Sequence, residues 1–457
     1  MARRSLSAVA ATTVLVVLIL LLPEPSGLPP AGKRTAALFA AAVILWASEA
    51  LPIGVTSLLV IVLQPVLQVA DLRAAFGGFA SPVFFFVLAM FCIAGAITGS
   101  GLDRRFAFFL LERAGGSSRR VVTALMVGTA ALSTIMSDVP ACAIFMAIGL
   151  GLLERLQIVP GESAFGKAVM IGIPIASLIG GVATPAGSSI NILGIHFIEQ
   201  YGKVRVSFLE WMAIGVPMVL LLTPLACWAV LRFYPPEIER ISDERERLGP
   251  MSAAEKKAIA LLSVMMLLWI ASTWFPRLDV TLVALAGSIV MFLPGIRLLD
   301  WPRANRVIGW DVLLMIGAVT SLGQVSVGSG LAKWLVDSVL GGMAQWPLAA
   351  ALAAISAVTV LVHIPLPVGP VINAVMIPPI ALMALDSGKN PALYALPIAF
   401  TASCGFLLPL DPVALVTYSR GYYRMLDMLA PGAVLSLVWI VVMTVLMLLL
   451  APLLGLV

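Results

Sequence analysis

Long apolar segments separated by short polar turns follow one another along almost the whole chain. A helix that crosses a bilayer core of about 30 Å needs about 20 mostly apolar residues. Segments of this kind lie at residues 7–23, 34–51, 54–70, 82–100, 209–233, 257–274, 279–296, 311–328 and 429–455. The first segment has no small-residue cleavage site before Pro23, so we interpret it as a transmembrane helix and not as a signal peptide. The pattern predicts an all-α polytopic membrane protein.

Four places inside other apolar segments carry residues that interrupt a helix. The segments 120–155, 166–198 and 346–385 are each broken, and so is one close to the C-terminal end. The four interruptions are Ser137 to Pro140, Gly180 to Asn191, Pro365 to Pro370 and Pro409 to Pro412. Irregular backbone is tolerated at membrane depth only where it is buried in protein or lines a cavity. The interruptions are therefore the expected places for a binding site.

The same order of segments occurs in both halves of the chain. Ser100-Gly101-Leu102 ends a long apolar run in the first half, and Ser329-Gly330-Leu331 ends one in the second. In each half a broken segment follows, and then a segment interrupted by Gly or Pro. Paired interruptions in corresponding positions indicate a transporter with internal repeats, although chance similarity between apolar segments is the alternative explanation. We predict 11 transmembrane helices in two inverted repeats, each with a re-entrant hairpin and a broken helix.

The repeat and the charges suggest how the chain is divided and oriented. We expect scaffold helices in 1–118 and 257–340, transport regions in 119–233 and 341–457, and a charged cytoplasmic connector in 234–256. If each hairpin enters and leaves the membrane on one side, about 20 of the 28 Lys and Arg residues face the cytoplasm. The prediction is a multi-pass protein of the cell (inner) membrane with a cytoplasmic N-terminus and an external C-terminus.

The composition excludes several functional classes. Hydrophobic residues make up 61% of the chain and charged residues 11%, whereas soluble domains carry about 25% charged residues. The net charge of +5 does not indicate a nucleic-acid partner, because the basic residues lie in short runs between apolar segments. The four cysteines lie in apolar stretches without metal-ligand spacing, so we expect neither a disulfide framework nor a cofactor. With no HExxH motif and only two distant histidines, an enzyme is not expected.

Ionisable residues within apolar segments are functional candidates, because a charge inside a bilayer is costly. The acids in such a context are Glu49, Asp138, Asp311 and Asp411. Asp138 and Asp411 lie at interruptions, where we favour a functional role over the capping of a helix end. The other two lie near the ends of predicted spans, where an interfacial or capping role explains them equally well. His363 precedes the interruption from Pro365 to Pro370, the expected tip of the second hairpin, and could carry a proton. Packing is the simpler explanation for a lone histidine such as His363 or His196.

The interrupted helices also indicate what kind of solute they bind. Free backbone carbonyls at such places suit Na⁺, and helix N-termini suit a carboxylate or a sulfate. Two hairpin tips and two unwound helices that meet would therefore form a coupled cation and anion site.

Five segments, in order along the chain, carry a resemblance to a known family. They are Trp46 to Thr56, Ser100 to Arg105, Ile179 to Asn191, Ala402 to Pro409 and Arg420 to Met428. In these residues the chain resembles the divalent anion/sodium symporter (DASS) family of the ion-transporter superfamily. The resemblance implies a homodimer with a central scaffold and mobile transport domains that work by an elevator motion. It also implies a small anionic substrate (a dicarboxylate, a tricarboxylate or sulfate) and Na⁺ as the coupling ion.

The resemblance implies site residues in the first half of the chain. The family carries a Ser-Asn-Thr triplet at each hairpin tip, whose side chains bind substrate and, with backbone carbonyls, Na⁺. Here Ser133 and Ser137 keep the family's spacing, but the triplet itself reads Ser137-Asp138-Val139. From the facing unwound helix we include Thr184, Gly187, Ser188 and Asn191 in the expected site.

The second half departs further from the family pattern. Its triplet aligns with Gly369-Pro370-Val371, which offers no side-chain hydrogen bonds, and the stretch after Pro409 is replaced by Asp411-Pro412-Val413-Ala414. From this half we include Gly369, Pro370, Asp411 and Pro412 in the expected site. The expected Na⁺ ligands of both halves are Ser133, Ser137, Asp138, Gly187 and Asp411.

Two carboxylates have thus appeared where the family has groups that bind an anion. A carboxylate repels a dianion unless a cation or a proton lies between them. Asp138 and Asp411 are therefore either sodium ligands or carriers of a coupling proton. The leading hypothesis is Na⁺-coupled symport of a small divalent anion. A proton-coupled anion transporter, a cation/proton antiporter and a channel are the alternatives.

Overall fold

All regular elements of the described chain are helices. The structure is a computed structural model that describes residues 2–48, 50–241, 249–275, 277–340 and 342–456. Within these residues no β-strand occurs, which confirms the predicted all-α class. Glu49 lies outside the described residues, and so does the middle of the predicted connector, 242–248.

Seven helical segments of the described residues are long and apolar enough to cross a membrane. They are α5 (Pro82–Ser100), α7 (Ser118–Met136), α9 (Ala164–Gly181), α11 (Phe208–Phe233), α15 (Trp310–Gly328), α18 (Gly369–Asp386) and the run Met425–Leu450, which contains α21 (Leu429–Leu450). Nine further helices in the described part of the chain are shorter or more polar. They are α1 (Ala2–Leu21), α2 (Pro30–Ser48), α3 (Ile53–Val66), α8 (Asp138–Arg155), α10 (Ser189–Gly202), α12 (Ala253–Ala271), α13 (Val280–Phe292), α17 (Leu348–Val362) and α19 (Pro391–Thr401). The multi-pass architecture is confirmed, and the number of 11 crossings stays a prediction.

Short helices that the hydrophobic pattern did not predict link several of the long ones. They are α4 (Leu72–Phe76), α6 (Leu102–Ala114), α14 (Trp301–Val307), α16 (Leu331–Leu335) and α20 (Pro412–Tyr418). Each is too short for the span of about 20 residues on which the prediction rested. The helix α6 is tied to the start of α12, because Arg105 donates to the Glu255 carboxylate at 2.5 and 3.1 Å and to the Gly249 carbonyl at 3.0 Å.

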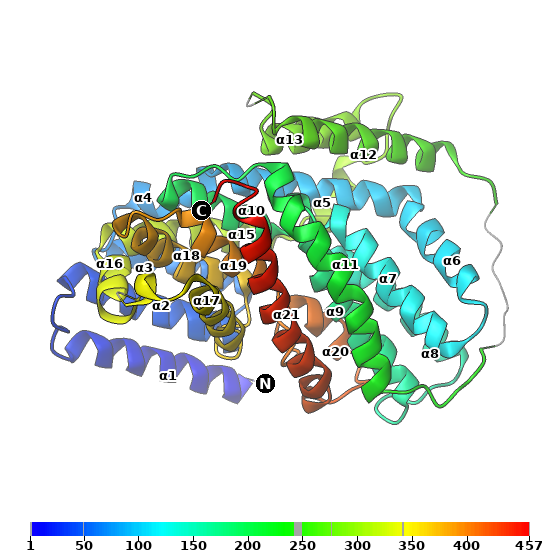
Figure 1. The fold of residues 1–457 in the computed structure, drawn as a ribbon, viewed down its shortest axis with the longest axis horizontal. Helices are drawn as coiled ribbons and strands as arrows, with labels where there is room; N and C mark the ends of the chain where they lie inside the picture. Colours follow the sequence, from blue (N-terminus) through cyan, green and yellow to red (C-terminus); the bar gives the residue numbers. More distant parts are fainter. Residues whose placement is uncertain (1, 49, 242–248, 276, 341, 457) are drawn as a thin grey trace.

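The packing of the helices brings the two halves of the chain together. In Figure 1, α2, α3 and α16 lie toward one end of the long axis and α6, α7 and α8 toward the other, while α11 and α21 run side by side between them. Helix α7 packs against α8 and α9, α20 packs against α8 and α9, and α10 packs against α18 and α19. The interrupted segments of both halves therefore lie in one contiguous region.

Many large apolar side chains on the outside of the bundle are exposed. Leu220 and Trp228 on α11 are 68% and 58% exposed, and Leu437 and Leu449 on α21 are 65% and 63% exposed. In water such a surface would be costly, because burial of apolar area is the main favourable term in folding. Hydrocarbon is its natural surrounding, as expected for a membrane protein.

The first predicted hairpin is sharply bent. Helix α7 ends at Met136 and α8 begins at Asp138, so Ser137 alone reverses the chain. Ser137 has φ +78°, a conformation that residues with a Cβ rarely adopt. In the second half the link between α17 and α18 is longer, and the two helices differ in their partners. Helix α17 packs mainly against α19 and α21, and α18 against α10 and α19.

Candidate ion and substrate site

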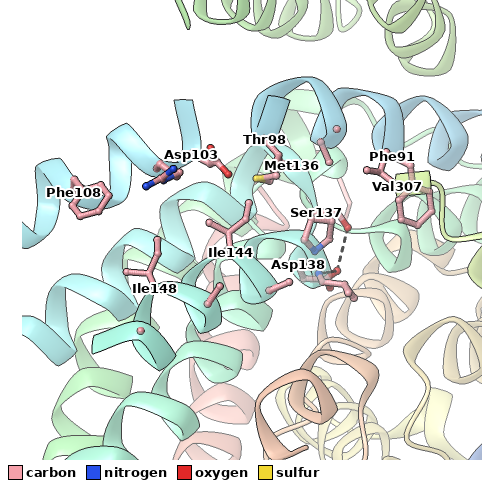
Figure 2. A pocket seen from close by; sticks show the side chains of 18 of the residues that line it. Phe91, Thr98, Asp103, Phe108, Met136, Ser137, Asp138, Ile144, Ile148 and Val307 are labelled. Atoms are coloured by element: carbon pink, nitrogen blue, oxygen red, sulfur yellow. Dashed lines mark hydrogen bonds between the residues drawn. The ribbon is translucent and has the colours of Figure 1, made fainter. Parts of the chain in front are cut away.

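A large cleft separates α5 and α6 from α8. Its volume is about 1200 Å³, and its walls are mostly apolar. Figure 2 shows Thr98 and Asp103 across the cleft from Asp138 and Ile144. At its inner end the cleft is lined by the first hairpin tip (Ser137, Asp138 and Val139), so this part of the predicted site faces an open space.

The Asp138 carboxylate is held at the N-termini of two helices. Asp138 is the first residue of α8, and its Oδ1 accepts hydrogen bonds from the Val139 N–H at 2.9 Å and the Ser137 hydroxyl at 3.2 Å. Its Oδ2 accepts a hydrogen bond from Ser188 Oγ at 2.8 Å, and Ser188 is the N-cap of α10. Helix N-termini attract negative charge. The side chain therefore occupies the kind of position in which an external anion would bind.

Backbone atoms of the first half approach each other closely beside this carboxylate. A Cβ on Gly187 would lie 2.3 Å from the Gly181 carbonyl oxygen and 3.0 Å from the Ser133 carbonyl oxygen. A Cβ on Gly181 would lie 3.2 Å from the Gly187 oxygen, 3.4 Å from Ser133 Oγ and 3.6 Å from the Asp138 Cβ. Only glycine allows this approach. The predicted residues Ser133, Asp138 and Gly187 are therefore brought together, with several oxygen atoms in one small volume.

Two other predicted residues hold the unwound segment in place. Asn191 donates from Nδ2 to the carbonyl oxygens of Gly181 at 2.7 Å and Thr184 at 2.9 Å. Thr184 donates from Oγ1 to the carbonyl oxygen of Thr134 at 2.7 Å. Both residues are buried, and their contacts are with backbone and not with the cleft: Thr184 ties the broken helix to α7, and Asn191 joins the two sides of the break. Among the described residues, the buried Asn191 Oδ1 has no hydrogen-bond partner.

Ser177 belongs to the same network but was missed from the sequence. Its hydroxyl donates to the Asp138 backbone oxygen at 2.6 Å, and its own carbonyl oxygen accepts from Ser133 Oγ at 2.8 Å. It lies in the uninterrupted part of α9, where no break marked it. Its position four residues before Gly181, on the helix that leads into the break, is the signal that could have found it.

The second hairpin tip lies elsewhere. A Cβ on Gly369 would lie 2.5 Å from the Ala402 carbonyl oxygen and 2.5 Å from Ile190 Cδ1. Gly369 and Pro370 are buried and are not among the residues that line the cleft. The structure therefore brings the tip against α10 of the first half, and does not place it beside Asp138 at the cleft.

Asp411 and Pro412 form the start of α20. Pro412 is the first helical residue, and Asp411 Oδ1 accepts a hydrogen bond from the Val413 N–H at 2.8 Å as the N-cap. The capping role that the sequence left as an alternative is thus present, and a sodium-binding role stays a prediction. Asp311 also serves a helix end, because its Oδ1 accepts from the Gly54 N–H in the first turn of α3 at 3.1 Å.

Known proteins that are similar to this chain in sequence or fold include several transporters. The family model "Sodium:sulfate symporter transmembrane region" matches residues 3–457. The sodium-dependent dicarboxylate transporter SdcS of Staphylococcus saprophyticus is 28% identical over 440 residues, which cover 89% of this chain and 84% of that protein. SdcS of Staphylococcus aureus is 26% identical over 426 residues, with coverages of 86% and 81%.

A solved structure has a similar fold. The crystal structure of the Alcanivorax borkumensis YdaH transporter matches this one with a TM-score of 0.53 and 15% identity. The match covers 98% of this chain and 96% of that one. At this identity the likeness concerns the fold alone. The family and the relatives are transporters, so this chain is a membrane transporter and not an enzyme.

Proposed function

Because this chain belongs to the sodium:sulfate symporter family, we propose that it is a secondary transporter that couples sodium flux to symport of a small divalent anion. The family description and the SdcS relatives support sodium as the coupling ion and a dicarboxylate or sulfate as the anion. The observation that carries the proposal is the cleft of about 1200 Å³ that ends at the Asp138 carboxylate. It offers a path from solution to a buried carboxylate, the kind of group that suits a cation.

Sodium binds at the first hairpin tip in this proposal. The ligands are oxygen atoms of Ser133, Ser137, Asp138 and Gly187, which surround the close approach of the two backbones. Hard cations prefer such oxygen ligands, and unwound transporter helices supply carbonyl oxygens for Na⁺. The carboxylate adds a full negative charge that the family's Ser-Asn-Thr triplet lacks. Asp411 lies in the second half, at the N-terminus of α20.

The anion binds on the cleft side of the same junction. A sodium ion beside Asp138 offsets the carboxylate charge, so that a dianion can lie near it without net repulsion. The hydroxyl groups of Ser137 and Ser189 line this end of the cleft, and Ser189 is the first residue of α10. The apolar walls that lead to it suit the carbon chain of a dicarboxylate better than the fully polar surface of sulfate.

An elevator motion of the transport regions, 119–233 and 341–457, would carry this site across the membrane. The cleft supports the division, because it separates α5 and α6 of the proposed scaffold from α8 of the proposed transport region. The proposal includes 11 crossings in two inverted repeats, a homodimer in the inner membrane, and a cytoplasmic N-terminus with an external C-terminus. The matching order of broken segments in the two halves supports the repeats.

A proton-coupled anion transporter or a cation/proton antiporter is the alternative function. It is favoured by the same carboxylate, because buried acids carry protons in many transporters. In the first case Asp138 would bind the coupling proton and the anion would still move. In the antiporter Asp138 would bind a proton or the transported cation itself, and no anion would move.

The test is uptake of labelled succinate and labelled sulfate into proteoliposomes that contain the purified protein. Parallel samples carry an inward Na⁺ gradient, an inward H⁺ gradient or neither. Uptake driven by Na⁺ supports the symporter, and uptake driven only by H⁺ assigns the coupling to protons. Absence of uptake of either anion, with protein shown to be folded, overturns the symporter and favours the cation/proton antiporter.

A further inference from the structure

The His363 ring lies between two backbone carbonyl groups. His363 Nδ1 is 2.9 Å from the Thr359 oxygen, and Nε2 is 3.1 Å from the Ala402 oxygen. A carbonyl oxygen can only accept a hydrogen bond, so each contact needs an N–H on the ring. A neutral imidazole has one N–H and leaves a lone pair facing the other oxygen. Only the doubly protonated ring satisfies both contacts.

Both carbonyl groups belong to helix C-termini. Thr359 is in the last turn of α17, and Ala402 directly follows α19, which ends at Thr401. The carbonyl groups at the end of a helix have no partner within the helix and carry partial negative charge. Two such ends that converge on one ring favour a positive charge at that point. The same arrangement of half-helix C-termini holds coupling cations in other transporters.

The first half has a corresponding arrangement, in which the Gly181 oxygen accepts a hydrogen bond from Asn191 Nδ2 at 2.7 Å and no imidazole ring is present. There the carbonyl oxygens of Ser133, near the end of α7, and of Gly181, at the end of α9, come together beside Gly187. Ser133 lies in the last turn of α7 as Thr359 lies in the last turn of α17. Gly181 is the last residue of α9, and Ala402 is the residue that directly follows α19. In the second half, the His363 ring fills the space between the matching carbonyl groups.

A carboxylate faces the same place. His363 and Asp411 both line a small cavity of about 10 Å³ between the two second-half links. This volume is close to the lower limit of about 10 Å³ for one water molecule. One Asp411 oxygen, Oδ1, is engaged by the Val413 N–H, and a Cβ on Gly405 would lie 3.5 Å from the other, Oδ2. The His363 ring and the Asp411 carboxylate thus border the same small space.

The neighbouring helices supply no competing charge near the ring. Helices α17 and α21 contain no charged residue, α19 contains only Tyr394 as an ionisable group, and Asp386 is the last residue of α18. On the link after α19, Cys404 donates from its thiol to Ser436 Oγ at 3.7 Å. A buried imidazolium needs a nearby opposite charge, and among the described residues that line the cavity this is Asp411.

We propose that His363, with Asp411 as its counter-charge, is a proton-binding site that takes in the second half the place that sodium takes in the first. The transporter then couples anion movement to sodium at one hairpin and to a proton at the other. This inference rests on the proposed symport for its role in coupling. The position of the proton itself does not depend on any substrate.

The protonation of the ring is tested directly by solid-state NMR of protein labelled with ¹⁵N-histidine in lipid bilayers. The chain has two histidines, so His196→Gln leaves the His363 signal alone. We expect both ring nitrogens in the protonated form near pH 7 and conversion to a neutral ring as the pH is raised. A neutral ring with a single tautomer from about pH 6 upward, where a free imidazole begins to lose its proton, overturns the inference. This readout stands even if no transported anion is found.

The coupling role is tested by pH-dye measurement of proton entry into proteoliposomes during sodium-driven anion uptake. In the wild type we expect proton entry with the anion, and an uptake rate that falls by about tenfold per pH unit once the ring loses its proton. His363→Gln keeps a donor for one carbonyl but holds no proton, so anion uptake should persist without proton entry and with a flat pH profile. Proton entry that is unchanged in folded His363→Gln protein overturns the role of His363.

Discussion

Asp138 Oδ2 and Ser188 Oγ are joined by a hydrogen bond of 2.8 Å, which links the first hairpin tip to the start of α10. The two residues are 50 positions apart and belong to helices that both begin at this point. The bond fixes a negative charge where two helix N-termini meet. A cation bound at the first hairpin, as proposed, would therefore act on the geometry of the hairpin and of the unwound helix at once.

Asp138→Asn should weaken sodium coupling. The amide keeps the size of the side chain but removes the charge that attracts the cation, so we expect the half-saturating sodium concentration to rise by at least about tenfold, which corresponds to about 1.4 kcal/mol. The measurement is anion uptake as a function of sodium concentration. Asp71→Asn is the matched control, because Asp71 caps the exposed helix α4 and Asn caps equally well. Unchanged sodium dependence in Asp138→Asn would remove this residue from the sodium site.

Gly187→Ala should damage both folding and transport. The new methyl group would meet the Gly181 oxygen at 2.3 Å, and backbone atoms cannot yield as a flexible side chain does. Overpacking of this kind costs about 1–3 kcal/mol. Thermal unfolding in detergent and sodium-driven uptake both report the change. In the control Gly151→Ala the methyl group meets no atom within 4 Å, so stability should be equal or slightly higher. Equal behaviour of the two variants contradicts the close approach at the site.

The cleft should admit water-soluble reagents along one face of α8. Ala147 lines the cleft and is exposed, whereas Ala141 on the same helix is fully buried. We expect Ala147→Cys to react with a charged thiol reagent at least about tenfold faster than Ala141→Cys, because thiol reactivity follows access. The four native cysteines are buried and should contribute little background. Equal labelling rates would mean that the cleft is closed to solution.

Acid should weaken the contact between α6 and the start of α12. The hydrogen bonds from the Arg105 guanidinium lower the pKa of Glu255 to about 2 from its ordinary value of 4.5. A depressed pKa means that the contact stabilises the folded state fully above about pH 4.5 and is lost as the pH falls toward 2. We expect the thermal midpoint of the wild type to fall more steeply than that of Glu255→Gln over this range.

The exposed acid Glu162 provides the comparison for this effect. In Glu162→Gln the thermal midpoint should fall with decreasing pH as steeply as in the wild type, since the Glu162 carboxylate makes no such contact with Arg105. If the thermal midpoint falls equally with decreasing pH in the wild type and in Glu255→Gln, the guanidinium contact does not contribute to stability.

The positions of the helix breaks could be predicted from the sequence because their causes are local. The first hairpin was expected to break between Ser137 and Pro140, and α8 indeed begins at Asp138. The break expected within Gly180 to Asn191 is confirmed by the end of α9 at Gly181 and the start of α10 at Ser189. Gly and Pro act on the backbone at their own position, so no tertiary information was needed.

Other features depend on contacts between distant parts of the chain. Helix α19 ends at Thr401, eight residues before the predicted break at Pro409, and the freed carbonyl of Ala402 is satisfied by His363. Such a partner 39 positions away leaves no local signal. Ser177 was missed for the same reason. Its role depends on its hydrogen bonds with Ser133 of α7 and Asp138 of α8, which are distant in sequence.

Asp138 also determines the order in which the proposed solutes can bind. Its carboxylate already occupies the N-termini of α8 and α10, so the empty protein presents a negative charge at the end of the cleft. An anion that arrives first meets repulsion, whereas a sodium ion meets a ligand. In the proposed symport we therefore expect sequential loading, with the cation first and the anion second. Under the proposed function such a transporter would not carry its anion alone, and one side chain would prevent a downhill leak of that anion.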